Sequence, residues 1–350
     1  MSDQRDTSMA SADVEPKSEA SSSFAAAGTA RSRRFGFNSR AFAHRWGLLV
    51  AWLIVIIVFG ALKPDVFLTG SNFSTIFGSQ AVLLILSLAL LVPLTTGEYD
   101  LSVAGTLGIA LILTESLTAD RGWALGPAIV VALLAGLVIG AVNAFFIIKI
   151  GVQSLIMTLG MGTLLTGIGY ALTASTVVGP SQFLQSAVTN HLLGIPLAFY
   201  YGLALTVFAW YVYARTPLGR YLYFVGSGRD VARLSGVKVD ALRAGSLIAS
   251  GFISAFAGVV LGGVLGSSSP TVSTNYLLPA FAAVFLGATA ITPGRFNPWG
   301  TFIGVYFLIT GITGLELLGL VGWIEQVFYG AALIIAVALS RLAAGRNAVT

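Results

Sequence analysis

Two carboxylates lie in a short polar stretch between apolar runs that are long enough to cross a bilayer. Residues 95–102 read TTGEYDLS and contain Glu98 and Asp100. A charged side chain at the centre of a membrane helix costs about 2.5–3.5 kcal/mol on insertion scales, and this cost indicates a structural or functional role for the two acids. Gly97 and the polar residues around it indicate a broken helix whose free backbone groups face a cavity. Asp100 is also well placed to cap the helix that follows, which is a structural role.

The chemistry that this stretch offers is recognition of a polar solute. A carboxylate at Glu98 would accept hydrogen bonds from solute hydroxyls or attract a cationic group, and a simple position at the membrane interface is the alternative. Asn143 lies inside a later apolar run, where a bond to a neighbouring helix is favoured over a bond to solute. Gln153 and Thr158 flank the start of the next run. We take Glu98, Asp100, Asn143, Gln153 and Thr158 as candidate pathway residues.

The composition excludes most other chemistry. The chain has 350 residues, of which 56% are apolar and 9% are charged, against roughly 25% charged residues in soluble domains. With no cysteine and two histidines, it has no disulfides or thiolate metal sites and little for a histidine metal centre. Its net charge of +5 is explained more simply by the cytoplasmic excess of bases in membrane proteins than by a nucleic-acid partner. We expect lipid around most of the chain, no nucleic acid and no bound cofactor.

The positioning elements are therefore membrane-spanning helices, and the fold class is all-α. Windows of about 20 apolar residues give a polytopic protein of about ten spans. The predicted spans are 46–62, 78–96, 101–118, 123–147, 154–174, 197–214, 244–266, 276–291, 298–317 and 322–341. Three glycine pairs with a spacing of four residues predict close helix approaches, at Gly136/Gly140, Gly258/Gly262 and Gly300/Gly304.

Residues 46–341 form one transmembrane domain between two polar tails in this interpretation. Residues 1–45 predict a disordered, basic cytoplasmic tail that contains no cleaved signal peptide and that fixes topology or serves as a regulatory or lipid-binding arm. Residues 342–350 form a short cytoplasmic tail. With about ten spans and both termini in the cytoplasm, only Lys63 and Arg121 among the bases from residue 31 onward fall outside, as the positive-inside rule requires.

Residues 215–243 are the long, basic, hydrophilic segment that follows the tail. Gly228 or the serine before it would cap a short helix with Asp230 in its first turn, and Gly236 would end it. Val231 and Leu234 share one face, which Val237 extends, while Arg229 and Arg233 share another. An apolar stripe favours a helix that docks on a partner, with the arginines available to acids at the rim. A surface loop that only fixes topology is the alternative.

ATP cannot be bound through a phosphate loop of the pattern GxxxxGKS or GxxxxGKT, because the chain has none. Energy from ATP would have to come from a partner chain that hydrolyses ATP and binds a cytoplasmic segment such as this helix.

Four blocks of the sequence carry a family resemblance. They read TTGEYDLSVAG, VQSLIMTLG, TPLGRYLYFVGSGRDVARLSGVKVDALR and VFLGATAITPGRFNPWGTFIG, in this order along the chain. Together they resemble the ribose/xylose-type permeases of bacterial ABC importers. The third block is similar to the family's coupling helix, which seats on the ATPase, and the matching residues are Gly219, Arg220, Gly226, Ala232, Leu234, Ser235 and Gly236.

The resemblance implies a type II ABC importer-like permease of ten spans in the bacterial inner membrane. It implies two permease subunits, identical or paralogous, two ATPase domains that hold ATP and Mg²⁺, and an external solute-binding protein. The coupling residues would be Arg229, Asp230, Ala232, Arg233, Leu234, Ser235 and Gly236. Glu98 departs from the family, which usually has glycine there, and Leu277 and Pro279 stand where the family often has acids. These departures leave the exact sugar open.

The function that these features favour is an importer permease for a small polar solute, a monosaccharide or a related polyol. An ion-coupled secondary transporter is the alternative, since Glu98 and Asp100 would supply an ion site, but it does not account for the helix within 215–243. A membrane-embedded enzyme is a further rival, yet His44 and His191 lie outside the predicted spans and form no catalytic constellation.

The predicted orientation is tested by reporter fusions. A reporter fused near Val237 should read cytoplasmic and one near Gln185 external, because 176–195 carries no base whereas 215–243 is strongly basic. Opposite readings at both fusions would reject the arrangement of about ten spans.

Overall fold

The computed structural model describes residues 39–173, 176–178 and 181–346. The predicted disordered tail lies outside the described residues up to position 38, and its last part, 39–45, already belongs to the first helix. The last helix likewise continues to Arg346, into the predicted C-terminal tail.

The described chain is helical, with four short strands. The elements near the N-terminus are α1 (Ser39–Leu62), α2 (Pro64–Phe67), α3 (Gly70–Ser79), α4 (Ala81–Thr95), α5 (Val103–Glu115), the π-helix η1 (Ser116–Asp120), α6 (Leu125–Ala144), the π-helix η2 (Phe145–Ile150) and α7 (Ser154–Leu172). The middle of the chain forms β1 (Val177–Val178), α8 (Gln182–Thr189), β2 (His191–Leu192), β3 (Ile195–Pro196), α9 (Leu197–Arg215), α10 (Pro217–Ser227), α11 (Arg229–Leu234) and α12 (Val239–Leu265). The remainder forms β4 (Ser267–Ser268), the 3₁₀ helix η3 (Val272–Tyr276), α13 (Leu277–Gly287), α14 (Pro298–Leu317) and α15 (Trp323–Arg346).

Each predicted span coincides with an apolar helical segment. Seven segments in the described residues are long and apolar enough to cross a membrane: Gly70–Thr95, Val103–Asp120, Leu125–Ile150, Ser154–Leu172, Leu197–Arg215, Val239–Leu265 and Pro298–Leu317. Three more are apolar but shorter, at Trp46–Leu62, Val272–Gly287 and Trp323–Ala338. The all-α fold class is confirmed, and the predicted number of about ten spans is approximate because three of the segments fall short of full length.

Helix α12 lies at the centre of the packing and contacts α4, α5 and α6. Apolar side chains cannot direct this packing in lipid, because lipid tails are as apolar as leucine. Small residues direct it instead. A Cβ atom on Gly136 of α6 would collide with the carbonyl oxygen of Gly251 on α12, and one on Gly258 with that of Leu107 on α5. The close approaches predicted from the three glycine pairs are confirmed for Gly136, Gly140, Gly258, Gly262, Gly300 and Gly304.

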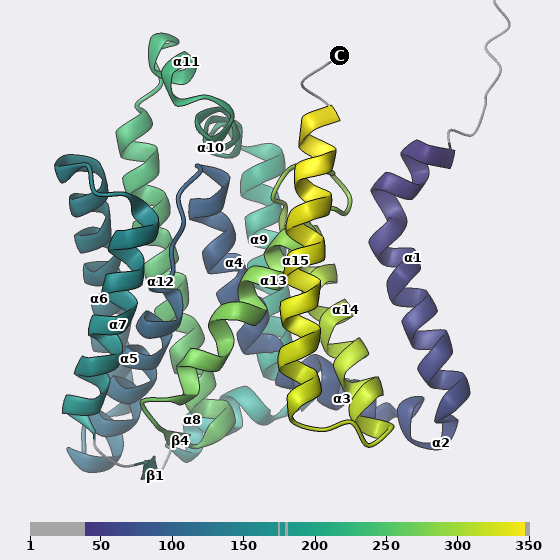
Figure 1. Ribbon diagram of the computed structural model, residues 1–350. Helices are drawn as coiled ribbons and strands as arrows, with labels where there is room; N and C mark the ends of the chain where they lie inside the picture. The colour runs from purple at the N-terminus through teal and green to yellow at the C-terminus, as the bar shows by residue number, and fades with distance from the viewer. Residues whose placement is uncertain (1–38, 174–175, 179–180, 347–350) are drawn as a thin grey trace, which may run out of the picture. The chain divides into compact units, whose positions relative to one another are not determined.

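The two ends of the helical bundle carry different short elements. Helices α10 and α11 lie at one end, whereas α8, β1 and β4 lie at the other (Figure 1). At that second end β1 pairs antiparallel with β4 and β2 with β3, the latter through His191 and Pro196. We call these the α11 end and the β1 end.

The short helix predicted within 215–243 is confirmed as α11. Gly228 is its N-cap residue, and Asp230 lies in its first turn. Gly236 follows the helix with a φ of 79°, which a residue with a side chain rarely adopts.

Candidate functional site

A non-helical segment, residues 96–102, separates α4 from α5, and we call it the break. Pro93 lies in the last turn of α4, and Gly97 has a φ of 79°. Proline removes a backbone donor and glycine tolerates the left-handed conformation, so the helix ends here. The side chains of Glu98 and Asp100 are buried, whereas Tyr99 is exposed. The interruption of the helix predicted from the sequence is confirmed, but the backbone N–H groups of Tyr99 and Leu101 bond α7 instead of facing a cavity.

Asp100 holds the start of α5. Its Oδ1 accepts hydrogen bonds from the backbone N–H of Ser102 at 3.1 Å and from the Ser102 hydroxyl at 2.6 Å. Its Oδ2 accepts from the Ser250 hydroxyl of α12 at 2.7 Å. The Asn143 side chain of α6 donates to the Ser102 oxygen at 2.8 Å. Asp100 and Asn143 thus belong to one buried network that joins the break to two neighbouring helices.

Helix α7 supplies two further contacts to the break. The Thr158 oxygen accepts the backbone N–H of Leu101 at 3.0 Å, and the Ser154 oxygen accepts that of Tyr99 at 3.3 Å. Thr158 is fully buried, whereas Gln153 is exposed at the N-cap position of α7. Among the five candidate pathway residues, Gln153 is the exposed one.

Glu98 faces α11. Its Oε1 accepts a hydrogen bond from Arg229 Nη2 at 2.6 Å and another from Arg243 Nε of α12 at 2.6 Å. Arg229 Nη2 also donates to the carbonyl oxygen of Gly97 at 3.0 Å. The side chain of Glu98 is only 3% exposed. We call Glu98, Arg229 and Arg243 the Glu98 cluster.

The Glu98 cluster gives Arg229 a partner within the chain. Its guanidinium pairs with Glu98 while its side chain is 39% exposed, so contact between Arg229 and acids of an ATPase stays a prediction. The reason for the pairing is geometric, since α10 packs through Gly226 against the end of α4 and α11 begins two residues after α10, which brings Arg229 within reach of the break. Arg233 pairs with Asp240 at 3.0 Å, with both side chains 58% exposed.

Helix α11 presents apolar side chains outward. Val231 is 60% exposed and Leu234 is 89% exposed. Ala232 is buried with Val225 and Val239, and Val237 packs against this small cluster. The apolar stripe predicted for the helix is therefore divided: Val231 and Leu234 face away from the protein. Four other predicted coupling residues are exposed as well, namely Asp230, Arg233, Ser235 and Gly236.

Helix α10 fixes the position of α11 against the break. A Cβ atom on Gly226 would collide with the carbonyl oxygen of Thr95, the last residue of α4. The Tyr223 hydroxyl donates to the carbonyl oxygen of Phe296 at 2.6 Å. Burial raises the pKa of Tyr223 to about 12, so this hydroxyl stays protonated as a donor.

Sequence reasoning missed the contribution of α12. Ser246 bonds Thr96 at 3.1 Å, and Ser250 bonds Asp100. In the sequence, Arg243 stands out only as one of the bases that predict a cytoplasmic position for residues 215–243. A signal was present, because Arg243, Ser246 and Ser250 fall on one face of a helix at i, i+3 and i+7.

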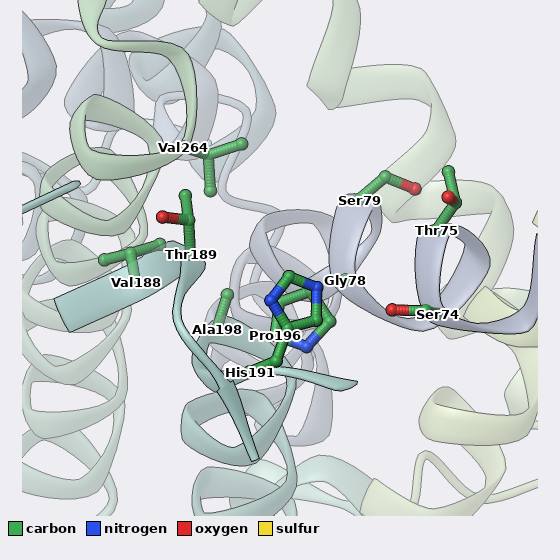
Figure 2. Close-up of a pocket in the computed structure, with 10 residues that line it drawn as sticks. All are labelled: Ser74, Thr75, Gly78, Ser79, Val188, Thr189, His191, Pro196, Ala198 and Val264. Atoms are coloured by element: carbon green, nitrogen blue, oxygen red, sulfur yellow. The ribbon is translucent and has the colours of Figure 1, made fainter. Parts of the chain in front are cut away.

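A pocket of about 220 Å³ is lined mainly by residues of α3, α8 and the chain that follows α8 (Figure 2). Helices α3 and α8 lie at the β1 end (Figure 1), whereas the break follows the C-terminal end of α4. Its lining combines hydroxyls, an imidazole and apolar carbons: Ser74, Thr75, Gly78, Ser79, Val188, Thr189, His191, Pro196, Ala198 and Val264. None of the candidate site residues lines it. The break, with its convergent polar contacts, is therefore the candidate functional site.

A bundle of apolar helices around an interrupted, polar-bonded element is the architecture of a membrane protein, and the comparisons with known proteins identify it as a transport component. The chain belongs to the family described as the branched-chain amino acid transport system / permease component, which matches residues 72–337. It is a multi-pass membrane protein, and its resemblance to the sugar permeases of ABC importers is confirmed. Importers of this family work in general with an ATPase and a binding protein.

Curated relatives match over most of their length. The chain is 31% identical to the ribose import permease protein of Escherichia coli K12, over 83% of this chain and 91% of the relative. It is 28% identical to the D-allose transport system permease protein of the same strain, over 89% and 96%. It is 29% identical to the autoinducer 2 import system permease protein of Salmonella paratyphi A, over 84% and 91%. No solved structure matches the chain.

Thr158 tests the stability of the break. Thr158→Val keeps the side-chain shape but leaves the Leu101 N–H without its acceptor, which costs about 1–3 kcal/mol. We expect a lower unfolding temperature for the detergent-purified protein. The control is Thr163→Val on the same helix, because the exposed Thr163 hydroxyl donates only to its own helix at Leu159. Equal unfolding temperatures for the two variants would contradict the assignment.

Proposed function

We propose that this chain forms the translocation pathway of an ATP-driven importer for a monosaccharide or a related polyol. The ribose, allose and autoinducer 2 permeases to which it is similar support this solute class. An external binding protein delivers the solute, and ATP with Mg²⁺ binds on a partner ATPase. A second permease subunit, identical or paralogous, completes the pathway.

The observation that carries the proposal is the exposed apolar pair on α11. Val231 and Leu234 project from a helix that otherwise carries Arg229, Asp230 and Arg233. Apolar anchors surrounded by polar residues are typical of a protein interface. The ATPase is the partner that an importer needs on this side, so α11 is the coupling helix in this proposal.

The α11 end is the cytoplasmic end in this proposal. Arg215, Arg220 and Lys238 lie in the segment that forms α10, α11 and their flanks, and bases gather on the cytoplasmic side. The first helix begins and the last ends at this same end (Figure 1). Both termini are therefore cytoplasmic, and the membrane is the bacterial inner membrane.

The solute passes close to Gln153 in this proposal, since the side chain of Gln153 is exposed and can hydrogen-bond a solute. Asp100, Asn143 and Thr158 act by shaping the break, because all three are buried with partners in the protein. Both acids are already paired with groups of the protein, which leaves them poorly suited to bind a coupling ion and favours an importer over an ion-coupled transporter. Glu98 is paired with two arginines, and Asp100 accepts three hydrogen bonds.

Leu234→Asp tests the coupling role of α11. The side chain is 89% exposed, so the protein should insert and fold normally. Truncation of an apolar anchor in an interface typically costs about 1–2 kcal/mol or more of binding free energy. A charge at position 234 should therefore abolish co-purification with the ATPase and ATP hydrolysis stimulated by the binding protein. The control is Leu193→Asp, because Leu193 is equally exposed at 89% but lies in the β2–β3 turn at the β1 end. A normal ATPase complex with Leu234→Asp would show that α11 is not the docking element.

The solute class is tested with the binding protein of the same transport system. Calorimetric titration with pentoses, hexoses and polyols should give saturable binding for at least one of them. Uptake of that solute by vesicles should require this chain and ATP. Binding of branched-chain amino acids without any sugar would reject the proposed solute class.

A further inference from the structure

We propose that Glu98 is a positioning residue that transmits movement of α11 to the break between α4 and α5. The inference rests on the proposed function of α11 as the coupling helix. Arg229 on α11, Glu98 in the break and Arg243 on α12 form one ionic connection, with both arginine contacts at 2.6 Å. Three separate elements thus meet at a single carboxylate oxygen.

The connection is short, and it is better shielded than the neighbouring pair. The side chains of Glu98, Arg243 and Arg229 are 3%, 13% and 39% exposed, whereas the Arg233–Asp240 pair is 58% exposed on both sides. Salt and water weaken an exposed pair far more than a buried one. The Glu98 cluster therefore holds its geometry under conditions in which the outer pair contributes little.

Helix α11 also contacts α12 through the exposed Arg233–Asp240 pair. Its one buried residue is Ala232, which contacts α10 and α12 residues. Arg229 is the side chain that reaches the break, where it donates to Glu98 and to the Gly97 carbonyl oxygen. A shift of α11 along its docking surface must therefore pull on Glu98 or break the ionic connection.

The break is hydrogen-bonded to α12 on both sides of Glu98, so a movement of Glu98 is transmitted to that helix. Two residues before Glu98, Thr96 bonds Ser246, and two residues after it, Asp100 bonds Ser250. Ser246 and Ser250 lie on the same face of α12 as Arg243. A displacement at Glu98 therefore acts on α12 and on the start of α5, which are elements of the buried bundle.

The experiment compares Glu98→Gln with the unaltered chain in the complete complex of permease, ATPase and binding protein in vesicles. Glutamine keeps the side-chain shape and removes the charge. ATPase co-purification should be unchanged, because Val231 and Leu234 remain. Solute transported per ATP hydrolysed should fall by about fivefold or more, the scale of typical coupling energies. Glu98→Asp, which keeps the charge, should recover part of this loss.

Asp120→Asn is the control, since it removes an exposed carboxylate of η1, which contacts β1 at the opposite end of the bundle. It should leave the transported amount per ATP unchanged. Arg229→Gln removes the Arg229–Glu98 ion pair through its other partner. The loss of transport per ATP in the double variant should therefore not exceed that of Glu98→Gln alone. Arg229→Gln also serves if Glu98→Gln fails to insert.

Two results separate the possible failures. If Glu98→Gln and Arg229→Gln lower the unfolding temperature but leave transport per ATP intact, the Glu98 cluster only stabilises the fold and the inference is overturned. If Leu234→Asp leaves the ATPase complex intact, the coupling role of α11 fails, whatever Glu98 does.

Discussion

A helix that is interrupted inside an apolar bundle leaves backbone groups without helical partners, and this constraint organises the structure around residues 96–102, where Glu98 and Asp100 are buried and Gly97 and Tyr99 are exposed. Each unpaired group in such surroundings costs several kcal/mol, so neighbouring elements must supply partners. Ser154 and Thr158 accept N–H groups from the break, and Asp100 accepts another from within it. Arg229 donates to the Gly97 carbonyl oxygen. Elements far apart in the chain therefore have to converge on this one segment.

Convergence of this kind requires close packing, which small residues provide. Gly226 lets α10 contact the carbonyl end of α4, and Gly136 with Gly251 lets α6 approach α12. The polar contacts and the glycine contacts are complementary. Serine and threonine hydroxyls are short, so they reach the break only if their helices come close, and glycines make that approach possible.

The sequence predicts the helices well, because hydropathy, bases and caps are local signals. The spans, the break at Gly97 and the short helix that ends at Gly236 all follow from such signals. The partner of Glu98 could not be predicted, because Arg229 and Arg243 lie in distant segments and no local pattern joins them. The serines of α12 were predictable in part, since Ser246 and Ser250 form a polar row in an apolar helix.

The charge balance of the Glu98 cluster indicates why these residues work as a unit. One carboxylate faces two arginines, and Asp240 lies 3.7 Å from Arg243 as a second, outer counter-charge. Removal of one partner from a buried pair costs about 3–5 kcal/mol, because the remaining charge is left uncompensated. Arg243 is fixed on α12, whereas Arg229 belongs to a six-residue helix with a single buried side chain. Glu98 therefore joins α12, which packs against α4, α5 and α6, to a short helix with one buried side chain, so a displacement of α11 would reach the break through this carboxylate.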